Sequence, residues 1–436
     1  MISTHTYKQT FYPDSLTFEL VKESGRIYSK ALALNKNDKN IKEIEKEMQE
    51  YCKKNTKYLH SQSAQAAYQS FIINLKSYFK ALKEYEKNPS KFSGKPKPPH
   101  KNKFMYKITF KKSAIKYKNE TLFLSVKKPH EPIKVKWAKH LPIPTWVIIS
   151  YDKFEGWNIN FVMEKEIKHL NLDKNKIMSI DLGVKRVATT FDTVSKQCTT
   201  YNGKELMSLV RLRNKVDAKC KSKKSNYKKG SRKHKRISRA NRRIVKRIKN
   251  KQNDILHKMS RMIVNDCIKK GIGRIIIGDS SGTHNKTNLG KENQKVQQNP
   301  EQKLKRFIIY KFESVGGTTE VVPEPYTSRE CIKCENIKSS SPKGRTYSCD
   351  IVECSFEYDR DGIGCVNILK KNSKNASFDR KYWLDVVGGL TPPKGVKYDK
   401  YNTSGLSLAQ KTVKSGKSKI RDSETKVEES ISRLWA

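Results

Sequence analysis

Apolar residues recur every three or four positions between Tyr58 and Tyr85, which is the spacing of one face of an α-helix. Ser61 and Ser63 stand where such a helix needs an N-cap. Residues 88–103 then interrupt the pattern with four prolines among lysines, and proline lacks the backbone N–H that helices and central strands use. We therefore expect a packed helix followed by a basic linker.

Beyond this linker the period changes to two, which is typical of strands with one buried face. Apolar and polar residues alternate over 108–126, with a turn expected at Lys118–Glu120. A second hairpin is predicted between Trp146 and Glu164, with Gly156 near its turn. The pattern predicts a small antiparallel sheet or barrel, with the helical segment placed before it or inserted into it.

Four shorter apolar runs predict strands of another sheet, at 177–181, 187–191, 275–277 and 321–322. The first two are joined tightly at Gly183–Lys185, and the first carries Asp181 in an otherwise apolar strand. A carboxylate in such a strand is a candidate functional group. The alternative is a turn aspartate that caps the bend at Gly183.

The densest basic run lies between these strands. Residues 211–251 hold 20 Lys or Arg and one acid, Asp217, around an apolar stripe of nearly helical period. A solvated helix is the usual interpretation of a charged stripe, but exposed surfaces normally mix both signs, so we favour a helix that faces nucleic acid. Its candidate contact residues are Lys235, Arg236, Arg239, Arg242, Arg243, Lys246 and Arg247. A nuclear import signal is a further hypothesis.

The composition also indicates a polyanionic partner. Lys and Arg number 92 against 43 Asp and Glu, a formal charge of +49, and self-repulsion at that level opposes compaction unless nucleic acid neutralises it. Hydrophobic residues make up 35% of the 436 residues, enough for two or three domains with cores. The basic residues are therefore expected on a folded scaffold.

The chain shows no apolar run of 18 residues, and Met1–Phe11 lacks the apolar core of a signal peptide. We expect an intracellular protein, cytoplasmic or nucleoid-associated, and nuclear in a eukaryotic or viral host. Nine cysteines fit a reducing compartment, in which most of them remain thiols.

Four clustered cysteines, Cys331, Cys334, Cys349 and Cys354, have the spacing of a zinc site. Two thiols with two residues between them grip one side of a tetrahedral ion, and the later pair supplies the other side. Four thiolates leave no open coordination position, so the predicted zinc is structural. The alternative is a set of unrelated buried thiols.

Carboxylates follow the predicted strands. Asp181 lies in the first strand and Asp361 precedes a helix predicted over 362–369, the layout of an RNase H-like sheet, where the first strand meets a late helix. Carboxylates from separate elements suit Mg²⁺, and two such ions suit phosphodiester hydrolysis. Asp279 and Glu324 are both candidates for the third carboxylate, because ligands gather outside neighbouring strand ends.

Several motifs together resemble the RuvC-type nuclease domain and zinc ribbon of TnpB proteins, relatives of Fanzor proteins and type V CRISPR effectors. They are Ser179–Lys185, Tyr326–Ser328 leading into Cys331 and Cys334, Cys354, Asp359–Asp361 and Asn367–Ile368. The resemblance implies an RNA-guided DNA endonuclease that binds a guide RNA and target double-stranded DNA and cuts with Mg²⁺. It implies that Asp181 and Asp361 are catalytic and that the four cysteines hold zinc.

The chain departs from the family pattern in one place. Many members end the middle strand with a Glu-Asp pair, whereas this chain has Gly278 and Asp279. In the branch shared with Fanzor proteins the glutamate stands just before the Tyr-Thr-Ser element, and Glu324 occupies that place here. The resemblance therefore favours Glu324 over Asp279, and the Cys349–Cys354 gap is wider than usual for the second knuckle.

We therefore expect an α+β multidomain protein. Residues 1–170 are predicted to form a wedge-like β-barrel with a helical recognition segment at about 14–100. Residues 171–325 and 355–372 are predicted to form the RNase H-like domain, with a zinc ribbon inserted at 326–354 and a disordered tail at 373–436. An inactive nucleic-acid-binding regulator of transposition is the alternative function. A strand-joining transposase is disfavoured, because no serine or tyrosine recombinase constellation is evident.

Overall fold

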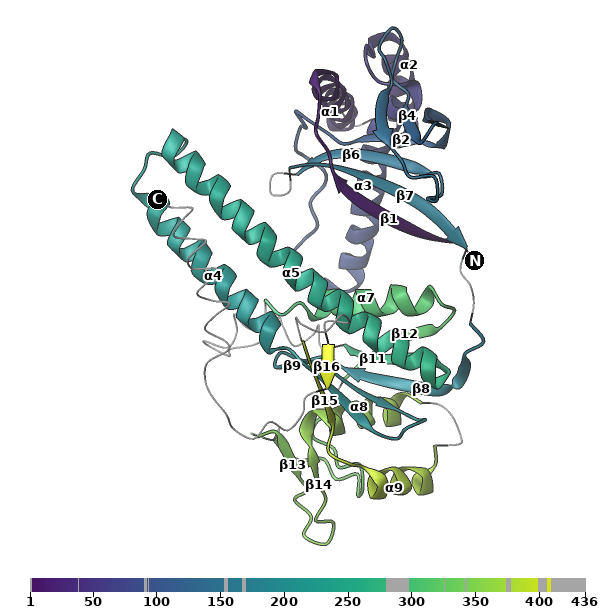
Figure 1. Cartoon of the computed structure of the whole chain (residues 1–436), viewed down its shortest axis with the longest axis vertical. Coiled ribbons are helices and arrows are strands. Elements are labelled where there is room, and N and C mark those ends of the chain that lie inside the picture. Colours follow the sequence, from purple (N-terminus) through teal and green to yellow (C-terminus); the bar gives the residue numbers. More distant parts are fainter. Residues whose placement is uncertain are drawn as a thin grey trace. The chain divides into compact units, whose positions relative to one another are not determined.

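The computed structural model describes residues 2–37, 39–89, 92, 94–152, 156–166, 170–279, 298–324, 326–340, 342, 344–373, 378–398 and 406–408. The chain divides into two compact units, Met1–Glu166 and Ile167–Ala436, and each has its own hydrophobic core (Figure 1). The prediction of an α+β protein with several domains is confirmed. None of the described helices is long and apolar enough to cross a membrane.

The first unit contains two antiparallel sheets. The larger has the order β1-β7-β6-β2, with β1 (Ile2–Thr10), β2 (Ile108–Lys111), β6 (Trp146–Asp152) and β7 (Gly156–Glu166). The smaller has the order β3-β4-β5, with β3 (Ile115–Lys118), β4 (Thr121–Leu124) and β5 (Ile133–Lys136). Both expected hairpins are present, since β6 pairs with β7 and β3 pairs with β4.

The turn between β3 and β4 lies where the sequence predicts it. Asn119 and Glu120 have φ values of 48° and 54°, so both central residues are left-handed. Two such residues in a row match the right-handed twist of the strands on either side. The two sheets are separate among the described strands, and they do not by themselves show a closed barrel.

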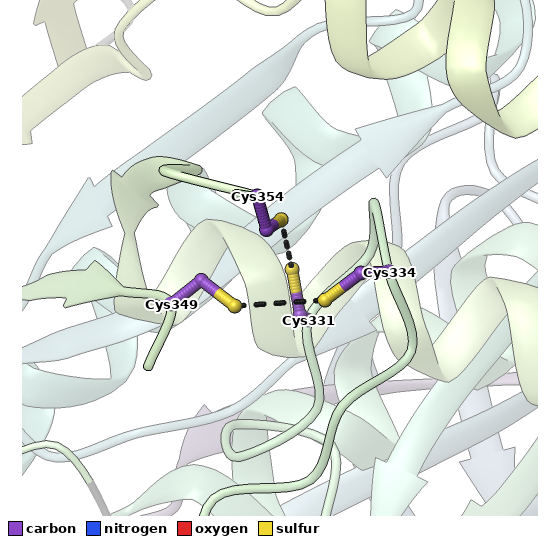
Figure 2. Close-up of side chains that lie close together, drawn as sticks. All are labelled: Cys331, Cys334, Cys349 and Cys354. Atoms are coloured by element: carbon purple, nitrogen blue, oxygen red, sulfur yellow. Dashed lines mark hydrogen bonds between the residues drawn. The ribbon is translucent and has the colours of Figure 1, made fainter. Parts of the chain in front are cut away.

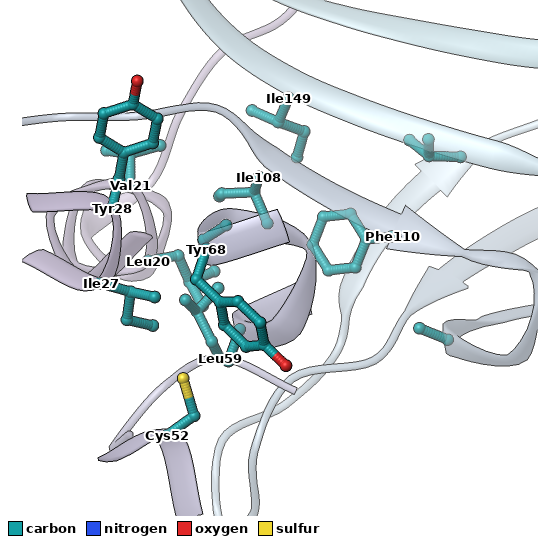
Figure 3. Close-up of a cluster of buried hydrophobic side chains, with 14 of the residues drawn as sticks. Leu20, Val21, Ile27, Tyr28, Cys52, Leu59, Tyr68, Ile108, Phe110 and Ile149 are labelled. Carbon is teal, nitrogen blue, oxygen red and sulfur yellow. The ribbon is translucent and has the colours of Figure 1, made fainter. Parts of the chain in front are cut away.

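Three helices stand between β1 and β2 in the chain, as expected for a helical insertion. They are α1 (Ser15–Lys36), α2 (Ile41–Asn55) and α3 (Ser61–Lys87). Their apolar faces pack with the strands in one core, which includes Leu20, Tyr68, Ile108, Phe110 and Ile149 (Figure 3). The predicted helix at 58–85 is thus α3, and a helix as amphipathic as this gains most of its stability from such packing.

A seven-stranded sheet organises the second unit, in the order β12-β11-β8-β9-β10-β15-β16. Its first five strands in chain order are β8 (Asp173–Asp181), β9 (Arg186–Asp192), β10 (Cys198–Asn202), β11 (Ile272–Asp279) and β12 (Thr318–Pro323). Strands β8, β11 and β12 are parallel, whereas β9 is antiparallel to both of its neighbours. The carboxyl ends of three strands therefore meet at one edge of the sheet.

Helices cover both faces of this sheet. The core on one face joins Ile275 and Ile277 to α4 (Lys204–Ser225), α5 (Arg232–Lys270) and α7 (Glu301–Glu313). On the other face, Ile276 packs with α8 (Arg360–Asn372). Side chains that alternate along β11 are buried on both sides, which explains its uninterrupted apolar run.

The basic run forms two helices rather than one. Helix α4 ends at Ser225 and α5 begins at Arg232, so the chain turns back and the two helices pack side by side (Figure 1). Gly230, with φ of 91°, and the N-cap Ser231 mark the break. The Nδ2 of Asn241 donates to Asp217 across the pair, at 2.9 Å.

The prediction of a disordered tail from residue 373 is wrong for the described part of that segment. Residues 380–389 form α9 (Arg380–Gly389), and β15 (Lys394–Tyr398) pairs in parallel with β10. A short strand β16 (Leu406–Leu408) then pairs with β15. The apolar residues are few, but Trp383, Val386 and Val396 are each at most 4% exposed, so they anchor the segment. Residues 374–377, 399–405 and 409–436 lie outside the described part.

Candidate active site and metal centre

Asp181 is the last residue of β8, so it stands at the edge where the parallel strands end. Its neighbour Ile180 pairs in register with Ile277 of β11. The pKa of Asp181 is raised well above its usual range, first by burial and then by the negative charges of Glu324 and Asp361. Two of the carboxylates predicted from other elements thus lie close enough to Asp181 for their negative charges to act on it.

Helix α8 approaches Asp181 closely because a glycine faces it. A Cβ on Gly364 would lie 3.0 Å from the Oδ2 of Asp181, tighter than an ordinary contact. Around this point the Ser179 hydroxyl donates to the Cys365 carbonyl at 2.8 Å, and the Cys365 thiol donates to the Ser179 carbonyl at 3.2 Å. These contacts fasten the helix that carries Asp361 to the strand that carries Asp181.

Glu324 directly follows β12, and its side chain lies over Gly278 of the neighbouring strand. A Cβ on Gly278 would lie 2.5 Å from Cδ and 2.6 Å from Cγ of Glu324. The glutamate therefore occupies the space that any side chain at position 278 would need. Its Oε1 atom is buried and has no hydrogen-bond partner among the described residues.

The surroundings of Glu324 are mainly acidic. Burial, followed by the charges of Glu301 and Asp279, raises the pKa of Glu324 to about 7, and Lys305 partly offsets this. Asp279, the other candidate for the third carboxylate, accepts a hydrogen bond from the Lys305 ammonium at 2.9 Å. Of these two candidates, Glu324 is thus the one with a buried carboxylate oxygen, Oε1, that accepts no hydrogen bond from the described residues.

Asp361 is surrounded by guanidinium groups. Arg345 donates to its Oδ2 at 3.0 Å, Arg360 donates to its Oδ1 at 3.3 Å, and Arg186 lies 3.4 Å from Oδ2. Asp359 caps the helix by accepting from the Asp361 and Gly362 amides, both at 3.1 Å. The cap fixes the first turn of α8 and so the position of Asp361.

A cavity of about 380 Å³ opens between these groups. Asp181 and Asp361 line it together with Arg186, Arg345 and Arg360. Carboxylates suit a hard cation and guanidinium groups suit a phosphate, so one cavity offers ligands for both. The chemistry that such a lining permits is metal-assisted attack on a phosphate ester.

The four cysteines converge on one point, as Figure 2 shows. Their Sγ atoms all lie within 4.8 Å of one another, with Cys331 to Cys354 at 3.8 Å and Cys334 to Cys349 at 3.5 Å. Zn–S bonds of about 2.3 Å in a tetrahedron place sulfurs roughly 3.8 Å apart, so the thiols could hold a zinc ion. Among the residues described, they are the one group of three or more metal-ligating side chains gathered this tightly.

The second knuckle matches the first despite its wider spacing. The Cys331 amide donates to the carbonyl of Asn336, and the Cys349 amide donates to that of Phe356, each at 2.9 Å. Each acceptor lies two residues after the second cysteine of its pair. Glu335 and Ser355, which directly follow those cysteines, both have positive φ. The extra residues between Cys349 and Cys354 thus leave the turn geometry intact.

The cysteine segment is fastened to the sheet by α8. Strands β13 (Thr346–Ser348) and β14 (Glu357–Asp359) pair, and β14 runs directly into α8. The buried Asn367 donates through Nδ2 to the carbonyls of Thr327 and Glu330, both at 2.8 Å. The predicted ribbon at 326–354 therefore extends to residue 359, and the same helix braces both the ribbon and Asp361.

The basic residues predicted to contact nucleic acid all lie on α5. Arg236, Arg239, Arg243 and Arg247 are exposed and follow one another at three- or four-residue intervals, so they form a stripe. Lys235 is also exposed, whereas Arg242 and Lys246 are partly covered. The buried Ile237, Ile244 and Ile248 occupy a separate face that packs into the core.

Three residues of this region were not predicted from the sequence. Arg186 and Arg345 contact Asp361, and Glu301 lies near Asp181 and Glu324. Arg186 follows the bend after Asp181, and the Asn-Pro-Glu run at 299–301 is typical of a helix start, but neither pattern indicates a partner. Arg345 lies in a polar stretch where no sequence pattern predicts a contact with Asp361.

Comparison with known proteins supports the family resemblance. Residues 160–283 match a family model described as probable transposase, OrfB_IS605, and residues 302–368 match the Cas12f1-like TNB domain. The first match covers β8, β9 and the basic helices, and the second covers α7, β12 and the cysteine segment. Together they contain Asp181, Glu324 and Asp361.

Curated relatives match over part of their length. A putative RNA-guided DNA endonuclease from Streptomyces pristinaespiralis is 24% identical over 64% of this chain and 66% of its own. The CRISPR-associated endodeoxyribonuclease Cas12f1 from Sulfoacidibacillus thermotolerans is 30% identical over 52% of each. A TnpB-like protein from Methanocaldococcus jannaschii is 29% identical over 30% of this chain and 47% of its own. The chain thus spans between about half and two thirds of the length of these relatives.

A solved structure shows the same fold. The chain is similar to the protein of a Cas12f1–sgRNA–target DNA complex with a TM-score of 0.54, at 15% identity, over 80% of this chain and 81% of that one.

Proposed function

Since this chain belongs to the TnpB family, we propose that it is an RNA-guided endonuclease that cuts target DNA with divalent metal ions held by Asp181, Glu324 and Asp361. In this proposal residues 171–325 and 355–372 form a RuvC-like domain, which agrees with the first strand and a late helix meeting at the carboxylates. Residues 1–170 form the wedge-like barrel with its helical insertion.

One observation carries the proposal: the Glu324 carboxylate fills the space left by Gly278, and its buried Oε1 has no partner among the described residues. A buried carboxylate oxygen without a hydrogen bond is costly unless a cation completes it. The negative charges of Glu324 and Asp361 both act on Asp181, and the unpartnered Oε1 of Glu324 is a carboxylate oxygen, the type of ligand that Mg²⁺ prefers.

The carboxylates and the arginines around this centre would have different roles. When bound, two Mg²⁺ ions would stabilise the attacking and leaving oxygens of an in-line displacement. Asp181 and Asp361, which line the cavity, would hold the cations together with Glu324, whose charge acts on Asp181. Arg186 and Arg345, which pair with Asp361 in this structure, present guanidinium groups to the same cavity and would bind phosphate oxygens of the cut strand.

The zinc ion is assigned a structural role in this proposal, because four thiolates leave no position for substrate. The guide RNA and target duplex would be held through their phosphates by the basic residues, while base pairing supplies sequence specificity. The exposed arginine stripe on α5 is the best-defined candidate surface, and the formal charge of +49 agrees with such a role.

The test is cleavage by the purified protein with the RNA that co-purifies with it. The RNA is sequenced, a matching duplex is supplied with Mg²⁺, and products are resolved on a denaturing gel. We expect cutting by the wild type and none by Asp181→Ala, with RNA affinity unchanged. Tight RNA binding without any cutting by the wild type would instead favour the inactive regulator.

A further inference from the structure

A fourth carboxylate lies beside the proposed centre. Glu301 stands in the first turn of α7 and is 3% exposed. A glutamate in the first turn gains from the helix dipole, but that gain is small and is available equally at the surface. Burial of an ionised side chain is unfavourable unless specific partners compensate it. The partners of Glu301 therefore indicate what its position does.

Asn299 connects this carboxylate to the strand that carries Asp181. Its Nδ2 donates to Glu301 Oε2 at 2.9 Å and to the Gly183 carbonyl at 3.0 Å. Gly183 stands two residues after Asp181, in the turn between β8 and β9, where a Cβ would lie 2.9 Å from the Arg186 carbonyl. The start of α7 is thereby tied to a turn that has little room to adjust.

The negative charge of Glu301 acts on two members of the centre. The Glu301 carboxylate is separated by the Asn299 amide alone from the turn that follows Asp181, and its charge adds to the negative charge around Glu324. Repulsion of this kind weakens the centre without a cation and strengthens its attraction for one.

We propose that Glu301 is a positioning residue of the carboxylate centre, which through Asn299 fixes the turn after Asp181 and through its charge raises the affinity for a divalent cation. The inference rests on the proposed function only for the identity of the centre. It assigns Glu301 no contact with the reacting atoms, since Asp181, Glu324 and Asp361 supply those ligands.

The test measures cation binding apart from cleavage. The full-length chain is loaded with zinc and titrated with Mn²⁺, and free Mn²⁺ is followed by its electron paramagnetic resonance signal. The formal charge of +49 keeps nonspecific cation binding low. Glu301→Gln keeps the shape and an acceptor for Asn299 but removes the charge. We expect it to weaken Mn²⁺ binding by about 10- to 100-fold, the usual range for residues that support metal ligands.

Two further variants separate positioning from folding. Glu313→Gln, at the exposed end of the same helix, is the matched control and should bind Mn²⁺ like the wild type. Asn299→Ala keeps the charge of Glu301 but releases the turn, so it should lower the maximal cleavage rate more than the Mn²⁺ affinity. In the cleavage assay, excess Mg²⁺ should restore most of the rate of Glu301→Gln.

The outcomes distinguish this inference from the nuclease proposal. Unchanged Mn²⁺ affinity in Glu301→Gln, with a normal melting transition, would overturn the positioning role even if the wild type cuts DNA. Mn²⁺ binding that Asp181→Ala abolishes and Glu301→Gln weakens, in a protein that never cuts, would support the positioning role and refute the nuclease.

Discussion

The sequence predicts that the third carboxylate comes from Glu324, after β12, and not from the end of β11. This prediction can be tested at Gly278, which lies on β11 beneath the Glu324 side chain. A Cβ at this position would stand 2.5 Å from Cδ of Glu324, which is about 0.9 Å closer than the 3.4 Å at which ordinary contact begins. The atoms in the way belong to the end of a flexible side chain, so the fold can yield by rotating Glu324 out of the space. We therefore expect Gly278→Ala to displace the carboxylate without disturbing the sheet.

The expected effects on stability and activity have opposite signs. Glycine inside a strand is destabilising by roughly 0.5–1 kcal/mol relative to alanine, so Gly278→Ala should melt no lower than the wild type. Glu324→Ala removes a carboxylate that would stabilise charge in the transition state, and such losses cost on the order of 10²–10³ in rate. Gly278→Ala should approach that loss although it removes no functional group.

The assay compares single-turnover cleavage of a guide-matched duplex with thermal melting of the same samples. A double variant, Glu324→Ala with Gly278→Glu, returns a carboxylate to the centre from β11, and the truncated side chain at 324 leaves room for it. We expect the double variant to cleave at least about ten times faster than Glu324→Ala alone. Glu313→Ala serves as a control for a distant glutamate in the same unit.

If Gly278→Ala cleaves DNA at the wild-type rate, the reasoning is refuted. The contact between the new Cβ and Glu324 would then have no effect on the position of the carboxylate. A double variant no more active than Glu324→Ala, with an intact melting transition, would show that the two positions do not serve one centre.

Three further predictions follow from features away from Gly278. Cys334→Ser should lose the zinc and lower the melting temperature, as checked by elemental analysis and calorimetry; a full zinc content would contradict the four-thiolate site. Burial lowers the pKa of Lys311 from 10.5 to about 8, so between these values the unfolded chain binds more protons. The unfolding free energy of the wild type relative to Lys311→Met should therefore rise from pH 8 towards 10.5, and parallel pH profiles in denaturant would refute this. Arg239→Gln and Arg243→Gln should each weaken RNA binding and reduce the slope of log affinity against log salt by about 0.7, and unchanged slopes would remove α5 from the interface.

The local pattern of the chain predicts its elements well where one face is buried. The alternation around β6 and β7 and the spacing within α3 each record a single apolar face. The segment after residue 373 was predicted to be disordered because its fold depends on three anchors, Trp383, Val386 and Val396; the first two are one helical turn apart and the third lies ten positions later, too few to establish a period. Their partners lie far away in the chain, which no local pattern can record.

The same limit governs the site. Asp181, Glu324 and Asp361 could be predicted because they lie in a strand, after a strand and at the start of a helix, respectively, and motifs support them. The orphaned oxygen of Glu324, the Arg345 contact to Asp361 and the Asn299 bridge to Gly183 depend on side-chain geometry across distant segments. Whether Glu324 or Asp279 completes the centre stays a prediction, although Lys305 already binds Asp279.

The central sheet has a consequence for the order of events during synthesis. Strand β15 pairs with β10 across almost 200 intervening positions, and Asp361 emerges from the ribosome long after Asp181. At roughly 5–20 residues per second, the 180 positions from 181 to 361 take about 10 to 40 s to translate. The arginine stripe of α5, which ends at Arg247, is complete 114 positions before Asp361, so for roughly 6 to 23 s of that interval the nascent chain carries the stripe without Asp361. On the proposed function, an RNA captured by the growing polypeptide would thus be bound before the proposed carboxylate centre is complete.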